Sequence, residues 1–133
     1  MLPPDATLSR FLTYSNHFKA GKATYKAFMP PPDLQLSMFQ TDGIAAAEIR
    51  ALAELNVLSG MSPGRSIYGH ADLSVAVLIA QNLQPIRDDD PDRHTSVGGW
   101  PEGGADDKEA HKEIALELAD AASLHLFDAP LSC

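Results

Sequence analysis

The sequence of 133 residues has very little cysteine, and Cys133 is the only one. No intramolecular disulfide and no four-cysteine zinc site can therefore form, and we expect a reducing, cytoplasmic compartment. Long apolar runs are also missing: the longest spans residues 75–80, far short of the roughly 20 residues that cross a bilayer. The first residues carry neither a basic segment nor an apolar one, so we predict no secretory signal and no membrane association.

Basic residues are scarce as well. The chain holds 10 Lys and Arg against 18 Asp and Glu, which gives a formal net charge of −8. This balance argues against a nucleic-acid partner, because proteins that bind nucleic acids present a basic face. The hydrophobic fraction of 44% and the charged fraction of 21% are those of a globular chain. At this length we expect one domain over residues 1–133, with residues 1–6 as an N-terminal arm.

Motifs of known mechanism are absent from the sequence. It contains no Walker-type phosphate loop, no G-x-G-x-x-G fingerprint, no G-x-S-x-G elbow and no H-E-x-x-H helix. The acidic run over residues 88–92, with His94 beside it, lacks the central glycine and the terminal glutamate of a calcium loop. We therefore predict no metal and no cofactor, and we expect a solvated acidic turn over residues 88–92.

Hydrophobic periodicity predicts several short strands and three helices. Apolar and polar side chains alternate over residues 34–39, which is strand spacing. Residues 43–58 instead carry apolar side chains at helical spacing after Asp42, a favourable N-cap. Strands are expected over residues 8–14, 23–29, 34–39, 65–69, 83–87, 94–97 and 123–127. Helices are expected over about 43–58, 73–81 and 106–122, with a strand as the alternative for the β-branched residues 75–79.

This order of elements is typical of an α+β domain of two layers, in which helices cover a mainly antiparallel sheet. Asp72 is the expected N-cap of the short helix, and Asn82 is expected to end it in the left-handed conformation. Pro85 favours an edge position for its strand, because proline cannot donate to a ladder. The predicted apolar stripe of the last helix consists of Ala110, Ile114, Leu118 and Ala121.

Five histidines are the main reactive side chains, since imidazole titrates near neutral pH and can relay protons. His111 falls on the polar side of the last helix and His125 alternates with leucines in a predicted strand, so we expect both to be solvent-exposed. His17 lies in a polar loop before a glycine, and His70 precedes a helix start, where backbone N–H groups attract anions. For His17 we favour a surface connector that Phe18 anchors to the core, and for His70 a residue that only leads into the helix cap at Asp72.

His94 is the strongest candidate for a functional side chain. It lies between Arg93 and Ser96 and shortly before a Gly-Gly pair, where a ligand can approach the backbone closely. In a strand, His94 and Ser96 share one face, so an imidazole and a hydroxyl stand side by side. The alternative is a strand with one polar face that ends in a glycine turn, with Trp100 filling the core.

The first functional hypothesis is a non-catalytic module that binds a protein partner or a small-molecule ligand. Aromatic side chains near predicted loops are candidate anchors for such a partner: Phe18, Phe28, Tyr68 and Trp100. A homodimer is expected if the strand over residues 34–39 lies at a sheet edge, because its apolar side chains would then need covering.

The second hypothesis is a small enzyme that acts on a phosphorylated or nucleotide-like ligand. His94 and His17 would transfer protons while Ser96 positions the substrate. The candidate ligand-binding residues are Arg10, Lys26, His70, Arg93 and Trp100. This hypothesis requires His17, His70 and His94 to converge in one cleft. A transition-metal site built from the same histidines is a weaker third hypothesis.

Overall fold

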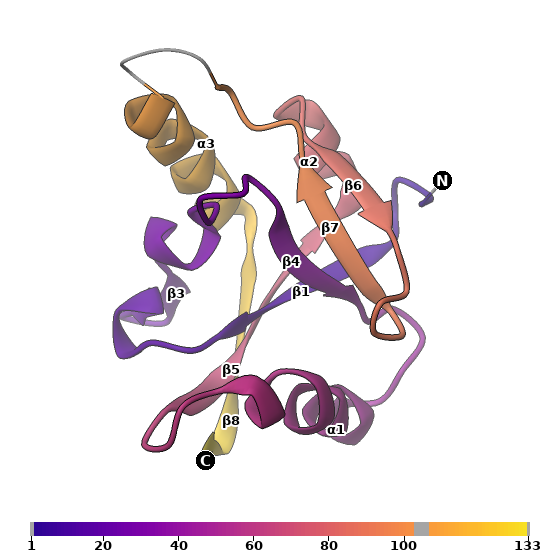
Figure 1. Cartoon of the computed structure of the whole chain (residues 1–133), viewed down its shortest axis with the longest axis vertical. Helices are drawn as coiled ribbons and strands as arrows, with labels where there is room; N and C mark the ends of the chain where they lie inside the picture. The colour runs from indigo at the N-terminus through magenta and orange to yellow at the C-terminus, as the bar shows by residue number, and fades with distance from the viewer. Residues whose placement is uncertain (1, 103–106, 133) are drawn as a thin grey trace.

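The structure, a computed structural model, describes residues 2–102 and 107–132. Its main strands are β1 (Thr7–Leu12), β4 (Leu36–Gln40), β5 (Ser66–Ser74), β6 (Gln84–Arg87), β7 (His94–Gly98) and β8 (Ser123–Ser132). They form one six-stranded sheet in the order β6-β7-β4-β1-β5-β8, and every neighbouring pair is antiparallel (Figure 1). A separate hairpin pairs β2 (Phe18–Lys19) with β3 (Lys22–Ala23).

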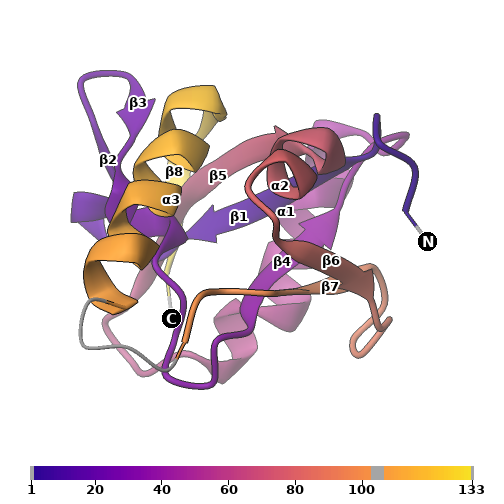
Figure 2. The same ribbon diagram turned by 90° about the horizontal axis from the view of Figure 1, so that it is seen from above.

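Helices lie on both faces of this sheet. The α-helices are α1 (Ala46–Asn56), α2 (Val75–Ala80) and α3 (Asp107–Ala121), and short 3-10 turns are η1 (Ser15–His17), η2 (Tyr25–Phe28) and η3 (Leu58–Gly60). Helices α2 and α3 cover one face, and α1 lies against the opposite face (Figure 2). The predicted fold class is confirmed: an α+β domain with a mainly antiparallel sheet, two longer helices and one short helix. Helix α1 forms a further layer on the second face.

The first face of the sheet carries the larger core. Alternation along the strands turns one set of side chains to this face, where they meet α2, α3 and η2. Fully buried members of this core are Leu8, Leu12, Phe28, Leu36, Met38, Leu78 and Leu118. Leu2 and Ala6 also pack into it, so residues 2–6 lie against the domain where we expected an arm.

The second face carries a smaller core beneath α1. Phe11 and Phe39 alternate with the residues of the first core and pack here with Ile49 of α1. Ile67 also packs here, although strict alternation along β5 would place it on the same face as Ala71 and Leu73 of the first core. A register shift between Ile67 and Gly69 interrupts that alternation.

Both predicted N-caps are wrong. Asp72 lies inside β5, which is longer than expected, so this residue does not begin α2. The carboxylate of Asp42 accepts the N–H of Thr7 at 3.1 Å, and α1 begins only after Ala45. Asn82 does adopt the predicted left-handed conformation after α2, with φ of 61°.

The strand predicted over residues 23–29 is wrong beyond its first residue. Ala23 pairs in β3, and the chain then turns into η2. Thr24 starts this turn, because its N–H donates to the carbonyl of His17 at 2.8 Å and its own carbonyl accepts the N–H of Ala27 at 3.1 Å. Ala27 and Phe28 are buried in the first core, so the apolar run reflects burial rather than strand pairing.

Strand β4 lies inside the sheet, between β7 and β1. The homodimer prediction depended on an edge position for this strand, so this reason for a dimer is removed. Strand β6, with Pro85, does lie at an edge as predicted.

In the part of the chain that the structure describes, no helix has both the length and the hydrophobicity that a bilayer crossing requires.

Candidate functional site

Two groups of polar side chains lie on the second face of the sheet, on either side of a pair of phenylalanines. Phe11 and Phe39 contact each other with their ring centroids 5.6 Å apart. The ring of His70 lies 6.2 Å from that of Phe11, and the ring of His94 lies 5.4 Å from that of Phe39. Two of the predicted site histidines therefore flank one aromatic pair.

His94 bridges a carboxylate and a hydroxyl. Its Nδ1 lies 2.7 Å from Oδ1 of Asp88, and its Nε2 lies 3.0 Å from Oγ of Ser37. Because an ionised carboxylate can only accept, Nδ1–H donates to Asp88, and in the neutral imidazole the lone pair of Nε2 then faces the hydroxyl of Ser37. We call these three residues the relay. The side chains of His94 and Asp88 are 13% and 39% exposed, and Ser37 is an exposed residue.

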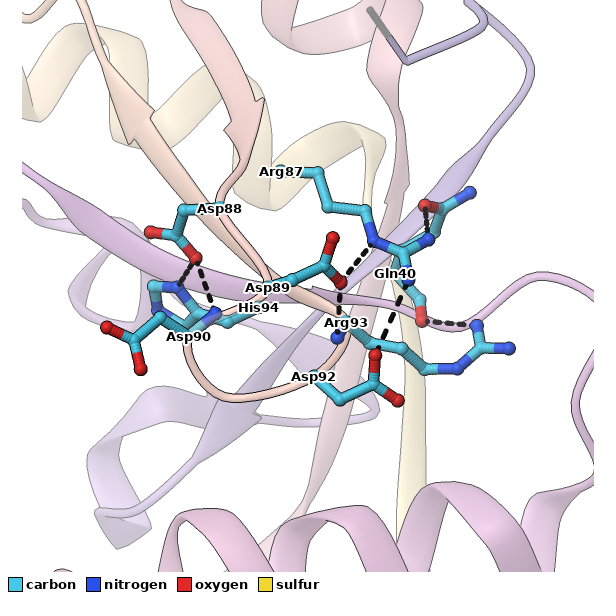
Figure 3. Close-up of polar contacts among 8 residues, drawn as sticks. All are labelled: Gln40, Arg87, Asp88, Asp89, Asp90, Asp92, Arg93 and His94. Carbon is cyan, nitrogen blue, oxygen red and sulfur yellow. Dashed lines mark hydrogen bonds and ion pairs between the residues drawn. The ribbon is translucent and has the colours of Figure 1, made fainter.

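The turn between β6 and β7 positions the carboxylate of the relay (Figure 3). The N–H groups of Asp88 and Asp89 both donate to the carbonyl of His94, which closes the hairpin. The carboxylate of Asp88 also accepts the N–H of Asp90 at 3.2 Å. Burial opposes the charge of this carboxylate, but the hydrogen bonds from His94 and Asp90 outweigh it and lower the pKa of Asp88.

Two other acidic side chains of this turn contact arginines (Figure 3). Asp89 accepts Nε of Arg87 at 2.7 Å and the backbone N–H of Arg93 at 3.1 Å, and Asp92 lies 3.7 Å from Arg87. The hydrogen bond from Arg87 is the main cause that lowers the pKa of Asp89. Within the described residues, no group of three or more histidine, cysteine and carboxylate side chains is arranged to hold a metal ion.

The hydroxyl that His94 contacts is not the one expected. Ser96 shares the exposed side of β7 with His94, as predicted, but Nε2 of His94 reaches across to Ser37 on β4. The register pairs Phe39 with His94 and Ser37 with Ser96, so Ser37 lies diagonally opposite His94. Alternation in the sequence placed Ser37 among the polar positions of its strand. It did not show which strand lies beside β7.

His70 is at the centre of the second polar group. Its Nδ1 lies 2.6 Å from Oδ1 of Asp72, and this oxygen also accepts the hydroxyl of Ser9 at 2.5 Å. His125, the partner of His70 on β8, stacks on it with ring centroids 5.0 Å apart, and Nε2 of His125 lies 3.5 Å from Oδ2 of Asp72. We call His70, Asp72 and His125 the His70 cluster. The side chain of His125 is 54% exposed, as predicted.

A cavity of about 480 Å³ opens beside this cluster, between α1 and strands β5 and β8. Its other lining residues are Ala46, Ala47, Ile49, Arg50, Leu126, Phe127 and Asp128. Arg50 supplies the cation of this wall: its guanidinium lies 5.0 Å from the ring centroid of Phe127, and Nη1 donates to the carbonyl of Ala129 at 3.2 Å. The sequence indicated His70 but not Arg50 or Asp72, because these residues meet only through the pairing of distant elements.

His17 has a structural role. It is buried in η1, and its Nδ1 accepts the N–H of Thr13 at 3.2 Å. Burial is the main cause that lowers the pKa of His17 to about 4, and the charges of two nearby arginines add to it. In the described chain no contact joins His17 to His70 or His94. The convergence of three histidines that the enzyme hypothesis required is therefore not seen.

The cations expected to hold an anion are mostly bound to backbone carbonyls. Arg10 donates Nε to Ala27 at 2.9 Å and Nη1 to Ser37 at 3.0 Å, and burial lowers its pKa to about 10. Arg93 donates Nη1 to a carbonyl at the end of β4, at 3.1 Å. Lys26 is exposed and lines a separate cavity of about 470 Å³ near η1 and η2.

Trp100 and His111 belong to the interior of the protein. Trp100 is 4% exposed, and its indole N–H donates to the carbonyl of Val97 at 3.0 Å, so it is not accessible as an anchor for a partner. The prediction that His111 is exposed is wrong. Its Nε2 donates to the carbonyl of Pro101 at 2.6 Å, which satisfies a buried imidazole. Helix α3 buries His111, Ala115, Leu118 and Ala119. Of the predicted stripe, Leu118 is therefore buried and Ile114 packs against the core, whereas Ala121 is exposed.

The chain matches no protein-family model, no curated protein sequence and no solved structure. Its function therefore has to be inferred from its own residues and geometry. On the second face, the relay and the cavity beside the His70 cluster each offer both titratable groups and access from solvent.

Proposed function

We propose that the protein is a small-ligand-binding module and that the cavity between α1 and strands β5 and β8 is its binding site. The observation that carries this proposal is the gathering of Arg50 and the His70 cluster around one cavity of about 480 Å³. Ligand pockets commonly enclose roughly 300–1,000 Å³ and combine apolar walls with a few polar groups that fix orientation. Ile49 and Phe127 supply apolar walls here.

The groups around the cavity suit a small organic anion, such as a carboxylate or a phosphate ester. Arg50 uses one nitrogen for a backbone carbonyl, which leaves the other N–H groups of its guanidinium for a ligand. The ring of Phe127 holds this guanidinium in place. Ala46 and Ala47, in the first turn of α1, line the cavity at the positive end of the helix dipole.

The imidazole of His70 offers a polar contact at the other side of the cavity. Because Asp72 holds Nδ1, Nε2 is the atom that remains for a ligand. The side chain of His70 is only 8% exposed, but it lines the cavity. Asp128 adds an exposed carboxylate to the wall, and its charge repels an anionic group that lies beside it.

Titration of the ¹⁵N-labelled protein with inorganic phosphate, and separately with succinate, tests this proposal by NMR. We expect saturable shifts of the amides over residues 46–50 and 125–128. The variant Arg50→Gln should bind about tenfold more weakly or worse, because a hydrogen bond to a charged group contributes roughly 1.5–3 kcal/mol and a tenfold change needs about 1.4 kcal/mol.

Arg65→Gln is the matched control for this experiment. Arg65 also lies over an aromatic ring, that of Tyr14 at 3.9 Å, and also donates to a backbone carbonyl, that of Thr13 at 3.2 Å. It does not line the cavity, so its substitution should leave binding unchanged. Equal weakening in both variants, or no saturable shift with either anion at millimolar concentration, would refute the proposed site.

A further inference from the structure

The geometry points to a second function, which goes beyond ligand binding: the relay activates the hydroxyl of Ser37 as a nucleophile toward small carboxylic esters. None of the three relay residues lines the cavity of the proposed binding site. The two sites lie on opposite sides of the Phe11–Phe39 pair, so the inference stands or fails separately from ligand binding.

The relay has the parts that an activated serine requires. Such a serine needs a base within hydrogen-bond reach and a third group that orients the base. Nε2 of His94 lies 3.0 Å from Oγ of Ser37, and Nδ1 lies 2.7 Å from Asp88. The carboxylate selects the tautomer whose Nε2 accepts a proton, and its charge stabilises the imidazolium that forms once the proton has been transferred.

Neighbouring contacts hold the relay in this arrangement. The ring of Phe39 meets that of His94 edge-on, at 5.4 Å and 80°, which limits rotation of the imidazole. Arg10 donates to the carbonyl of Ser37 at 3.0 Å, and β4 pairs with β7 over this segment. Ser37 and His94 therefore stand on paired strands, and Asp88 lies in the turn directly after β6, so the relay does not depend on a long loop for its positioning.

The surroundings of Ser37 indicate the class of substrate. Ser96 lies directly opposite Ser37 in the register, so its hydroxyl is placed to donate to the oxygen of a tetrahedral intermediate. Ile86 on β6 pairs with Ser96 and is 62% exposed, which provides an apolar surface on the same face. One hydroxyl is a weaker oxyanion site than two backbone N–H groups, so we expect activated esters with short acyl chains.

The reaction runs through an acyl-serine. Oγ of Ser37 forms a bond to the carbonyl carbon of the ester while its proton passes to Nε2 of His94. The bond to the leaving alcohol breaks, and the alcohol oxygen takes this proton from Nε2. Water then gives a proton to Nε2 and attacks the acyl carbon. Oγ of Ser37 leaves with that proton, and the carboxylic acid is released.

The test uses the full-length chain with p-nitrophenyl acetate as substrate and a fluorophosphonate as a probe. The fluorophosphonate phosphonylates activated serines with loss of fluoride. We expect phosphonylation of Ser37, located by mass spectrometry, and release of p-nitrophenolate. The variant His94→Gln cannot take up a proton at neutral pH, so both rates should fall about 100-fold or more, as for the loss of a general base.

Ser132→Ala is the matched control. Ser132 is an exposed strand serine whose hydroxyl contacts the hydroxyl of Ser66 at 3.1 Å instead of an imidazole. This variant should keep the wild-type rates, whereas Ser37→Ala should lose both activities. The wild-type labelling pattern decides the question even if a variant fails to fold. Labelling of Ser37 no greater than that of Ser132, or p-nitrophenolate release that persists in Ser37→Ala, would overturn the inference.

Discussion

Among single residues, His17 should make the folded protein sensitive to acid. Its Nδ1 accepts the N–H of Thr13, which requires a lone pair on that atom, and its pKa is lowered to about 4. In an unfolded chain, histidine titrates near pH 6.5. Protonation therefore favours unfolding. The stability that the neutral ring contributes is fully present above about pH 6.5 and is lost as the pH falls toward 4, by up to about 1.4 kcal/mol per pH unit.

Urea unfolding at a series of pH values measures this effect. The variant His17→Asn keeps an acceptor near the position of Nδ1 but does not titrate, so its free energy of unfolding should depend less on pH than that of the wild type. Asp88 and Asp89 affect the free energy of unfolding only at lower pH. Their pKa values are lowered in the folded protein, so the stability that they contribute is lost only below the pKa of an unfolded aspartate, near 4. The other four histidines are present in both proteins, so the difference in slope between about pH 6.5 and 5 reports on His17. The same slope in both proteins there would contradict its assignment.

The sequence identified reactive residues better than it identified their partners. The pleat of a strand fixes which residues share a face, so His94 and Ser96 could be placed together before the structure was known. The contact of His94 with Ser37 depends on the order of strands in the sheet, which alternation does not encode. His111 shows the same limit in a helix, because the carbonyl of Pro101 that makes its burial tolerable lies in a different segment.

Among elements, the pairing of β5 with β8 depends on Gly69. A Cβ atom at this position would meet the carbonyl oxygen of His125 and would lie 2.7 Å from Cα of Leu126. Both are backbone atoms, and they can move only by disturbing the pairing of the two strands. Gly69→Ala should therefore destabilise the protein by about 2–3 kcal/mol, the upper range for overpacking, as measured by urea unfolding.

Gly60→Ala provides the control for this substitution. Gly60 lies in η3, and a Cβ atom there would meet nothing within 4 Å, so its replacement should change the free energy of unfolding by less than about 0.5 kcal/mol. A similar small effect for Gly69→Ala would show that β8 adjusts without cost. The close approach of the two strands would then not constrain the His70 cluster.

The elements that the sequence predicted best are those whose pattern is local. Alternation revealed residues 34–39, where Leu36 and Met38 share one buried face, and helical spacing revealed residues 43–58, where one face of the helix is buried. The apolar side chains of residues 23–29 have a different reason: Ala27 and Phe28 of η2 are buried in the first core. The bulge after Ile67 has no local signal either, because it exists only relative to the register with β8.

For the whole molecule, composition and the order of elements were sufficient for the fold class. They did not determine which face each helix covers. Helices α2 and α3 close the larger core on one face, whereas α1 lies alone on the other with a smaller core. The relay and the cavity are both on the face with the smaller core, so the candidate sites depend on the part of the domain that buries fewer apolar side chains.

Because α1 covers the smaller of the two cores, we predict that it opens more readily than the sheet. Native-state hydrogen exchange should give the amides of α1 a lower opening free energy than those of β1, which has partners on both sides. Ile49 is 8% exposed beneath α1, so Ile49→Ala should lower that opening free energy by about 2–4 kcal/mol. Leu55→Ala, on the same helix at a residue that is 73% exposed, should change it by less than about 0.5 kcal/mol.

The exchange pattern also bears on the proposed cavity, since Arg50 and the first turn of α1 form one of its walls. If α1 opens separately, a bound anion should raise the protection of its amides more than that of β1, because the ligand binds only the closed state. If the amides of α1 and β1 instead exchange with the same free energy, the two cores unfold as one unit. The cavity would then be as rigid as the sheet, and ligand binding would stabilise all of the elements equally.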